Sequence, residues 1–370
     1  MKRQFGFGIS VYPNVNDDQD MLRVSEYIKA AAKLEYGEVF SSLHLPELVY
    51  TQSLNEIQCL GVLVREYGMD FALDISGEML ENILQNRSLS SIMKNIPISH
   101  LRLDYGYSLN QIKEAVDKFG IKGFMLNASV LSEWEIKLMV TQLKAYDKSI
   151  HFKACHNFYP RPETGLSLDF MIKRSLQYKP YGIPVTACVN STTNPRMPLK
   201  MGLPTVEEHR NKGIEAATMS LLATEAVDAI LIGDSFASEN ELLAVSQRCL
   251  GKPVPLHIEL ETNICDLERK IIFGGVHHSR PDVAACSIRS QTSRQMASIG
   301  IYVPKGNIKQ RSRYSVTIDN EEYLRYSGEL HIITKELPAD ERVNVVGHIK
   351  PKDYYKIDFA SPGMDFYFIT

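Results

Sequence analysis

A regular alternation of short apolar runs and helical patterns constrains the fold of this chain more than any other feature. Eight such runs, from residues 5–11 to residues 228–232, alternate with eight helical patterns within about 250 residues. The runs are continuously apolar, as expected for parallel strands that are buried on both faces. Their number and order predict an α/β fold, a TIM (β/α)8 barrel over residues 1–250. A doubly wound sheet is the alternative, but Gly6 and Gly8 lie inside the first run without the third glycine of a dinucleotide-binding loop.

The pattern changes after residue 250. Short β runs, among them 255–260, 269–273 and 343–349, are separated by turn sequences, and helical patterns become scarce. Residues 251–370 are therefore predicted to form a smaller, mostly β domain. Within the barrel, residues 205–224 are expected to form one helix, with Thr205 as its N-cap and Glu208 completing a capping box.

Charge and hydropathy exclude several classes of partner. The net charge of −3 gives no basic excess for nucleic acid or for an anionic membrane. No apolar run approaches 18 residues, and the N-terminal sequence lacks the apolar segment of a signal peptide. The six cysteines are scattered without a C-x-x-C pair, which indicates free thiols in a reducing compartment. We therefore expect a cytoplasmic protein that acts on a small molecule and carries no cofactor.

Polar residues follow nearly every predicted barrel strand. In a TIM barrel these positions form the C-terminal rim, where active sites lie. The first two strands supply Ser10, Tyr12, Ser41, Ser42 and His44, and the later ones supply Asp74, Arg102, Asp104, Asn127, His156, Asn157, Tyr159, Arg161, Glu163, Asn190 and Asp234. Buried polar and charged groups are costly without partners, so this concentration favours a ligand site.

Asp74 and Asp104 end neighbouring strands and form the central candidate pair. Carboxylates at adjacent strand ends can lie about 5 to 10 Å apart, the range used by the carboxylate pairs of glycoside hydrolases. In the alternative, one caps the next helix and the other pairs with Arg102. Asp234, after the last strand, is expected to cap the helix that follows it.

Two other chemistries are open on the same rim. A metal could be held by His44, His156, Asp74 and Asp104, although no H-E-x-x-H or similar motif supports it. A Schiff-base aldolase would need a lysine, and the strand lysines, Lys122 and Lys153, lie at or near strand starts, away from the rim.

The densest polar stretch of the second domain is basic. It contains His277, His278, Arg280, Arg289 and Arg294. Arginine forks match phosphate or carboxylate groups, so the stretch is expected either to form an anion site that completes the barrel site or to be a solvated basic loop.

Eight motifs in one order resemble those of the bacterial 6-phospho-N-acetylmuramidase family. They are GISVYP, VFSSLHLPE, LDIS, LRLDYG, LNAS, HNFYPRPETGLS, GLPTVEEHR and HHSRPDVA with IRSQTSR, and they extend over essentially the whole chain. The resemblance implies a TIM barrel followed by a cyclophilin-like β domain. It also implies a cytoplasmic enzyme that cleaves N-acetylmuramic acid 6-phosphate β-1,4-linked to N-acetylglucosamine, a fragment recycled from the cell wall.

This substrate suggests roles for the rim residues. Asp74 and Asp104 would be the catalytic pair, with Glu163 as an alternative proton donor. Sugar hydroxyls and amides would bind to Asn127, His156, Asn157 and Tyr159, and the phosphate and lactyl carboxylate would bind to Arg102, Arg161 and the second-domain arginines. Another sugar-phosphate barrel enzyme and a non-catalytic phosphosugar-binding protein remain alternatives, and the oligomeric state is left open, with a homodimer among the options.

Overall fold

The computed structural model describes residues 5–12, 18–43, 50–296 and 302–370. These residues form two compact units, one that extends to Cys249 and one that spans Leu250–Thr370. Among the described residues no helix is long and apolar enough to cross a membrane. All six cysteines are free; Cys155, Cys188 and Cys249 are buried, whereas Cys59 is exposed.

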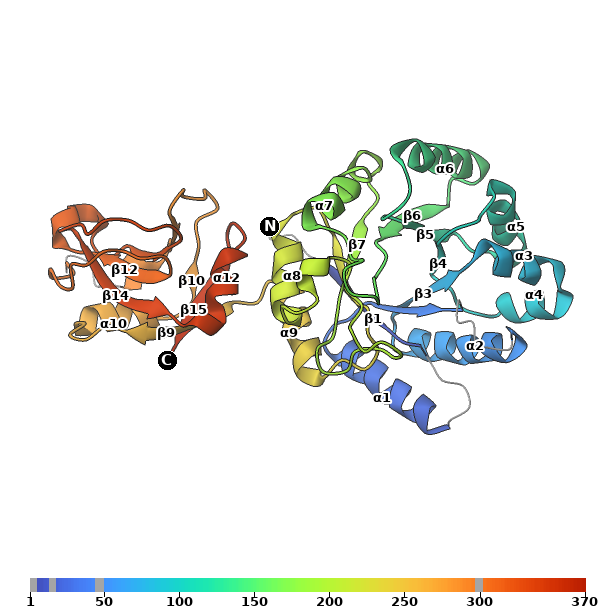
Figure 1. The fold of residues 1–370 in the computed structure, drawn as a ribbon, viewed down its shortest axis with the longest axis horizontal. Helices are drawn as coiled ribbons and strands as arrows, with labels where there is room; N and C mark the ends of the chain where they lie inside the picture. The colour runs from blue at the N-terminus through green and yellow to red at the C-terminus, as the bar shows by residue number, and fades with distance from the viewer. Residues whose placement is uncertain (1–4, 13–17, 44–49, 297–301) are drawn as a thin grey trace. The chain divides into compact units, whose positions relative to one another are not determined.

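The first unit is a closed barrel of eight parallel strands, which confirms the predicted architecture (Figure 1). Strand β1 pairs with both β2 and β8, so the sheet has no free edge. The strands are β1 (Gly6–Ser10), β2 (Glu38–Ser42), β3 (Asp70–Ile75), β4 (His100–Leu103), β5 (Gly123–Asn127), β6 (His151–Cys155), β7 (Val185–Val189) and β8 (Ala229–Ile232).

Helices surround the barrel strands. They are α1 (Asp18–Lys33), α2 (Tyr50–Glu66), α3 (Gly77–Gln85), α4 (Arg87–Met93), α5 (Leu109–Phe119), α6 (Glu133–Tyr146), α7 (Leu168–Leu176), α8 (Ile214–Ala223) and α9 (Glu239–Cys249), with a short 3-10 helix η1 (Lys179–Tyr181) before β7. Local sequence sets their ends: Ser108 and Ser132 begin α5 and α6 with capping boxes, and Gly120 ends α5 in the left-handed conformation.

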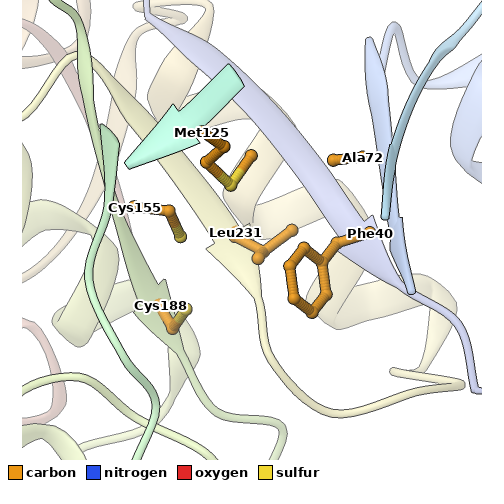
Figure 2. Close-up of a cluster of buried hydrophobic side chains, with 6 residues drawn as sticks. All are labelled: Phe40, Ala72, Met125, Cys155, Cys188 and Leu231. Atoms are coloured by element: carbon orange, nitrogen blue, oxygen red, sulfur yellow. The ribbon is translucent and has the colours of Figure 1, made fainter. Parts of the chain in front are cut away.

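The barrel interior is packed with apolar side chains. Figure 2 shows one cluster, to which six strands each contribute a residue: Phe40, Ala72, Met125, Cys155, Cys188 and Leu231. Successive side chains point to opposite faces of a strand, so the residue two positions after a packed interior residue also faces inward. Ser42, Asp74 and Asn127 follow Phe40, Ala72 and Met125 in this way, which places polar groups above an apolar floor.

The predicted helix at 205–224 is wrong in its first half. The segment forms a short 3-10 helix, η2 (Glu207–His209), and α8 begins only at Ile214, after Gly213. The Thr205 hydroxyl, predicted as a helix cap, instead donates to the Asn157 carbonyl at 2.9 Å and accepts from the Cys188 amide at 2.8 Å. These bonds to two neighbouring strand ends override the local capping pattern.

The second unit is built on a seven-stranded, mostly antiparallel sheet, which confirms the predicted smaller, mostly β domain. Its order is β10-β15-β9-β14-β12-β13-β11, and only β15 and β9 pair in parallel. The strands are β9 (Val254–Leu260), β10 (His277–His278), β11 (Ser287–Arg289), β12 (Ser315–Asp319), β13 (Leu330–Ile333), β14 (Val343–Ile349) and β15 (Asp365–Ile369). Its helices are α10 (Asp266–Phe273), α11 (Ser293–Met296) and α12 (Tyr354–Asp358), with the 3-10 helices η3 (Glu321–Tyr326) and η4 (Pro351–Asp353).

The predicted strand at 269–273 is also wrong, because this segment is the second half of α10. Glu268 accepts a hydrogen bond from the Cys265 amide at 2.8 Å, which starts the helix. Leu267, Ile271 and Ile272 then follow helical spacing, and Ile271 and Ile272 are fully buried. A run of apolar residues this short fits either element, and the cap decides in favour of the helix.

Candidate active site

A cavity of about 270 Å³ lies at the C-terminal ends of the barrel strands. Four residues of the apolar cluster in Figure 2 line it, namely Phe40, Cys155, Cys188 and Leu231, and most of the other lining residues are polar. The lining residues are Phe40, Ser42, Asp74, Arg102, Asp104, Cys155, His156, Asn157, Phe158, Cys188, Arg196 and Leu231. The cavity thus gathers six of the rim residues that the sequence suggested: Ser42, Asp74, Arg102, Asp104, His156 and Asn157.

Arg102 is the centre of the polar wall. Ser42 on β2, Asp74 on β3 and Arg102 on β4 are register partners on adjacent strands, so their side chains emerge at one level. The Arg102 Nη1 atom donates to Asp74 Oδ1 at 2.9 Å and to Asp104 Oδ1 at 3.0 Å, and Nη2 donates to Asn157 Oδ1 at 2.5 Å. Although burial opposes the charged form, Asp74 and Asp104 raise the pKa of Arg102 above its usual value.

The two carboxylates have different surroundings. Both oxygens of Asp74 are occupied, Oδ1 by Arg102 and Oδ2 by the Ser42 hydroxyl at 3.0 Å. Asp104 uses only Oδ1, which accepts from Arg102 and from Asn127 Nδ2 at 2.8 Å. No described residue donates to Asp104 Oδ2, and the Asp104 side chain is 25% exposed against 12% for Asp74. Asp104 is therefore the more available of the two.

Asn127 and Asn157 extend the network across the end of β5. Asn127 Nδ2 also donates to Asn157 Oδ1, at 3.0 Å, while its own Oδ1 accepts from the Ser129 amide at 3.0 Å. Asn127 is almost fully buried and is not among the residues that line the cavity. It therefore holds Asp104 and Asn157 in place, and a direct contact with sugar stays a prediction.

His156 lines the cavity but is only 1% exposed. Its Nδ1 and Nε2 atoms lie 3.2 Å from the Ser129 hydroxyl and 2.9 Å from the Ser175 hydroxyl. Burial, reinforced by Arg174 and Arg102, lowers its pKa to about 3, so the ring is neutral. Both ring nitrogens are engaged within the protein, and the predicted role in sugar binding stays a prediction.

The loop that carries Tyr159, Arg161 and Glu163 is held by one ion pair. The Glu207 carboxylate accepts from the amides of Glu163 at 2.9 Å and of Gly165 at 2.8 Å. A Cβ on Gly165 would lie 2.6 Å from Glu207 Oε2, so this approach requires glycine.

Arg210 is the other half of the clamp. Its guanidinium donates to both Glu207 oxygens, at 2.7 and 2.6 Å, and to the carbonyls of Tyr159 and Arg161, at 2.9 and 3.3 Å. The hydrogen bonds from Arg210 lower the pKa of Glu207 to about 2. Arg161 and Glu163 are exposed, and neither they nor Tyr159 line the cavity. Their proposed contacts with substrate stay predictions.

Arg196 was missed by the sequence reasoning although it lines the cavity. It lies in the segment between β7 and η2, where no regular pattern drew attention to it. Its guanidinium carbon lies 3.7 Å from the centroid of the Tyr12 ring. The one signal in the sequence that could have identified Arg196 as a rim residue was its position shortly after the end of a predicted barrel strand.

Asp234 does not cap the helix that follows it, contrary to expectation. It is fully buried and accepts from the amides of Ser191, Arg196 and Leu203 at 2.9, 2.7 and 3.1 Å. Burial raises its pKa, and the three amides oppose that shift. The helix α9 is capped instead by Ser238, whose hydroxyl accepts from the Glu241 amide at 3.3 Å.

The polar residues of the second unit are engaged within that unit. His277 is fully buried, with its nitrogens 3.0 Å from the Ser290 hydroxyl and 3.1 Å from the Ile272 carbonyl. The other predicted residues pair with acids or carbonyls: His278 with Asp365 at 2.7 Å, Arg280 and the partly buried Arg289 with Asp282 at 2.8 Å, and Arg294 with the Arg325 carbonyl at 3.1 Å. Whether these residues contribute to substrate binding stays a prediction.

Among the described residues, no lysine lines the cavity and no group of three metal ligands lies there. Lys153 pairs with Glu38, Lys122 pairs with Asp147 at 2.7 Å, and neither lines the cavity. His44 lies outside the described residues. One group that could hold a metal ion, Glu38 with Asp70 and His100, lies at the opposite, N-terminal end of the strands, where Lys153 already neutralises Glu38.

Family models match the two units separately. Residues 7–247 match the N-terminal model of 6-phospho-N-acetylmuramidase, and residues 254–369 match its C-terminal model. The chain belongs to the 6-phospho-N-acetylmuramidase family. The enzyme is accordingly a glycosidase, and the family name specifies a phosphorylated muramyl sugar as substrate.

Two solved structures are similar over almost the whole chain. One is an uncharacterised protein from B. cereus, 26% identical, with a TM-score of 0.76 and coverage of 99% of this chain and 100% of that one. The other is a conserved protein of unknown function from Enterococcus faecalis, 30% identical, with a TM-score of 0.72 and coverage of 99% and 96%. Among curated proteins no significant match is found.

Proposed function

We propose that the protein hydrolyses the β-1,4 bond between N-acetylmuramic acid 6-phosphate and N-acetylglucosamine, in the cytoplasm, during recycling of the cell wall. The observation that carries this proposal is the pair of carboxylates held on one arginine in the rim cavity. Asp74 Oδ1 and Asp104 Oδ1 both contact Arg102 Nη1, so these two oxygens lie within about 6 Å of each other. Membership of the family supplies the substrate class.

The different surroundings of the two carboxylates suggest different roles. A proton must reside on an oxygen that does not already accept an N–H or O–H donor, and Asp104 Oδ2 meets this condition among the described residues. Asp104 is therefore assigned as the acid that protonates the leaving glycosidic oxygen. Asp74 keeps both oxygens in hydrogen bonds, which suits a carboxylate that stabilises the positive charge developing at the anomeric carbon.

The spacing favours retention of configuration. Inverting enzymes place a water between carboxyl groups roughly 6.5 to 9.5 Å apart, whereas retaining enzymes use about 5 to 5.5 Å. The limit of about 6 Å applies to the two Oδ1 atoms that share Arg102 Nη1, and it is compatible with the shorter range. The anomeric carbon would then be trapped by a carboxylate or by the 2-acetamido oxygen of the substrate, and water would complete the hydrolysis with Asp104 acting as base.

Turnover of the synthetic disaccharide tests the proposal. The purified protein is expected to release N-acetylglucosamine and N-acetylmuramic acid 6-phosphate, which mass spectrometry detects. NMR is expected to show the β anomer of N-acetylmuramic acid 6-phosphate as the first product. The Asp104→Asn variant is the matched negative control, because it keeps the size of the side chain. If the parent protein and this variant give the same slow background release, the proposal is wrong.

A further inference from the structure

Arg196 differs from Arg102, the other arginine of the cavity, in the hydrogen bonds and ion pairs of its guanidinium group. Arg102 already donates hydrogen bonds to Asp74, Asp104 and Asn157, so its donors are used within the protein. The Arg196 guanidinium also lines the cavity, but no ion pair or hydrogen bond joins it to another described residue. The cavity thus contains a cation whose donors are available.

The backbone around Arg196 is fixed by two acidic residues of the barrel rim. Asp234 accepts from the Arg196 amide itself at 2.7 Å, and from two further amides of the same segment. Glu241 accepts from the Thr192 amide at 2.7 Å and from the Ser191 hydroxyl at 2.9 Å. Asp234 also attracts the Arg196 charge electrostatically, but its oxygens are taken by backbone amides. These hydrogen bonds therefore fix the backbone that carries Arg196.

The Tyr12 ring packs against the Arg196 guanidinium. The 3.7 Å separation is typical of an arginine stacked on an aromatic ring, which orients the fork without using its N–H donors. The Tyr12 hydroxyl donates to the Gly233 carbonyl at 3.4 Å, and its ring packs edge-on against Phe40 and Phe158, both of which line the cavity. The result is a positioned fork beside an aromatic wall, an arrangement suited to a sugar that carries an oxyanion.

We propose that Arg196 binds an oxyanion of the substrate, either the 6-phosphate or the lactyl carboxylate, and is the residue that selects anionic sugars in this cavity. The inference rests on the proposed function for the identity of the substrate. Tyr12 acts through Arg196 as a positioning residue.

Arg196→Gln tests the proposal, with Lys200→Gln as the matched control, because Lys200 is an exposed cation of the same segment that does not line the cavity. Kinetics are measured on the phosphorylated disaccharide, on its dephosphorylated form and on the phosphorylated analogue without the lactyl group. Since a charged hydrogen bond is lost, Arg196→Gln is expected to lower kcat/KM by about 10- to 100-fold on the first substrate, mainly through KM. Lys200→Gln is expected to match the parent.

The substrate that escapes this loss identifies the oxyanion. If Arg196 binds phosphate, the variant and the parent are equally active on the dephosphorylated substrate; if it binds the carboxylate, they are equally active on the analogue without the lactyl group. An equal loss on all three substrates, or none on any, overturns the proposal. Arg196→Lys, which keeps charge but not the fork, should recover only part of the activity, and thermal midpoints confirm that each variant is folded.

A binding measurement separates this inference from the proposed function. Calorimetric titration with N-acetylmuramic acid 6-phosphate needs no turnover. Suppose that the parent binds this sugar, that Arg196→Gln binds it at least 10-fold more weakly, and that neither protein cleaves the disaccharide. The oxyanion site is then supported and the proposed hydrolysis is wrong. Equal affinity of parent and variant, or no binding by the parent, overturns the oxyanion site.

Discussion

Replacement of Arg102 by methionine tests how strongly one guanidinium holds Asp74 and Asp104, the proposed catalytic pair, together. Methionine keeps much of the length of the side chain but removes the charge and the hydrogen bonds to Asp74, Asp104 and Asn157. The Arg102 side chain is 6% exposed, so the variant leaves two largely buried carboxylates without their cation. Breaking a buried ion pair in this way costs about 3 to 5 kcal/mol. For a unit of this size the unfolding midpoint should fall by roughly 6 to 20 °C.

The loss of stability in Arg102→Met should depend on pH. Without Arg102, Asp74 and Asp104 repel each other when both carry a charge, and a lower pH relieves this repulsion by favouring the protonated form of a carboxyl. Arg102→Met should therefore be less impaired at pH 5 than at pH 7, relative to the parent at each pH.

Scanning calorimetry of the full chain at both pH values is the assay, and the transition of the first unit is followed. Combining Arg102→Met with Asp74→Asn should recover part of the lost stability, because the second change removes the repulsion that the first creates. A midpoint for Arg102→Met within about 2 °C of the parent at pH 7 would refute the reasoning. An equal deficit at both pH values would show that lost packing, and not charge, explains the effect.

Two further predictions concern the groups around the cavity. Glu207→Gln should weaken the clamp on the loop and speed amide hydrogen exchange at Glu163 and Gly165, whereas Glu208→Gln, at an exposed neighbour, should not. Because the folded pKa of Glu207 is depressed to about 2, its contribution to stability is present above its unfolded pKa of about 4.3 and is lost as the pH falls toward 2. Equal protection of the two amides from exchange at pH 2 and pH 6, after correction for the intrinsic exchange rate, would contradict this. The folded pKa of His156 is depressed to about 3, so its contribution is present above about 6.5 and declines as the pH falls; His156→Gln should flatten that part of the stability profile, and an unchanged profile would contradict it.

The sequence was sufficient to predict the barrel because its signals are local and repeated. Each strand is a short apolar run, and each rim position follows from where a run ends. The pair Asp74 and Asp104 and the position of Arg102 beside them were predictable for this reason, since register partners and alternation along a strand bring them to one face.

Residues whose roles depend on distant parts of the chain could not be predicted in this way. Thr205 looks like a helix cap in isolation, and only the fold shows that it bonds to Asn157 and Cys188. Asp234 binds amides up to 43 positions away in the chain, which no local pattern reveals. Arg196 acquires its place through Asp234 and the Tyr12 ring, so its importance also emerges only from tertiary contacts.

Steady-state kinetics of Asp74→Asn and Asp104→Asn on the phosphorylated disaccharide test whether these two carboxylates catalyse the hydrolysis. Both substitutions keep side-chain size and remove a charge or an acid from the cavity. Each is expected to lower kcat by about 10²- to 10⁴-fold while KM changes less than 10-fold. Glu163→Gln, at the alternative proton donor, should retain most of the activity. Near-normal kcat in both aspartate variants, or a collapse of kcat in Glu163→Gln alone, would contradict the assignment of the carboxylate pair.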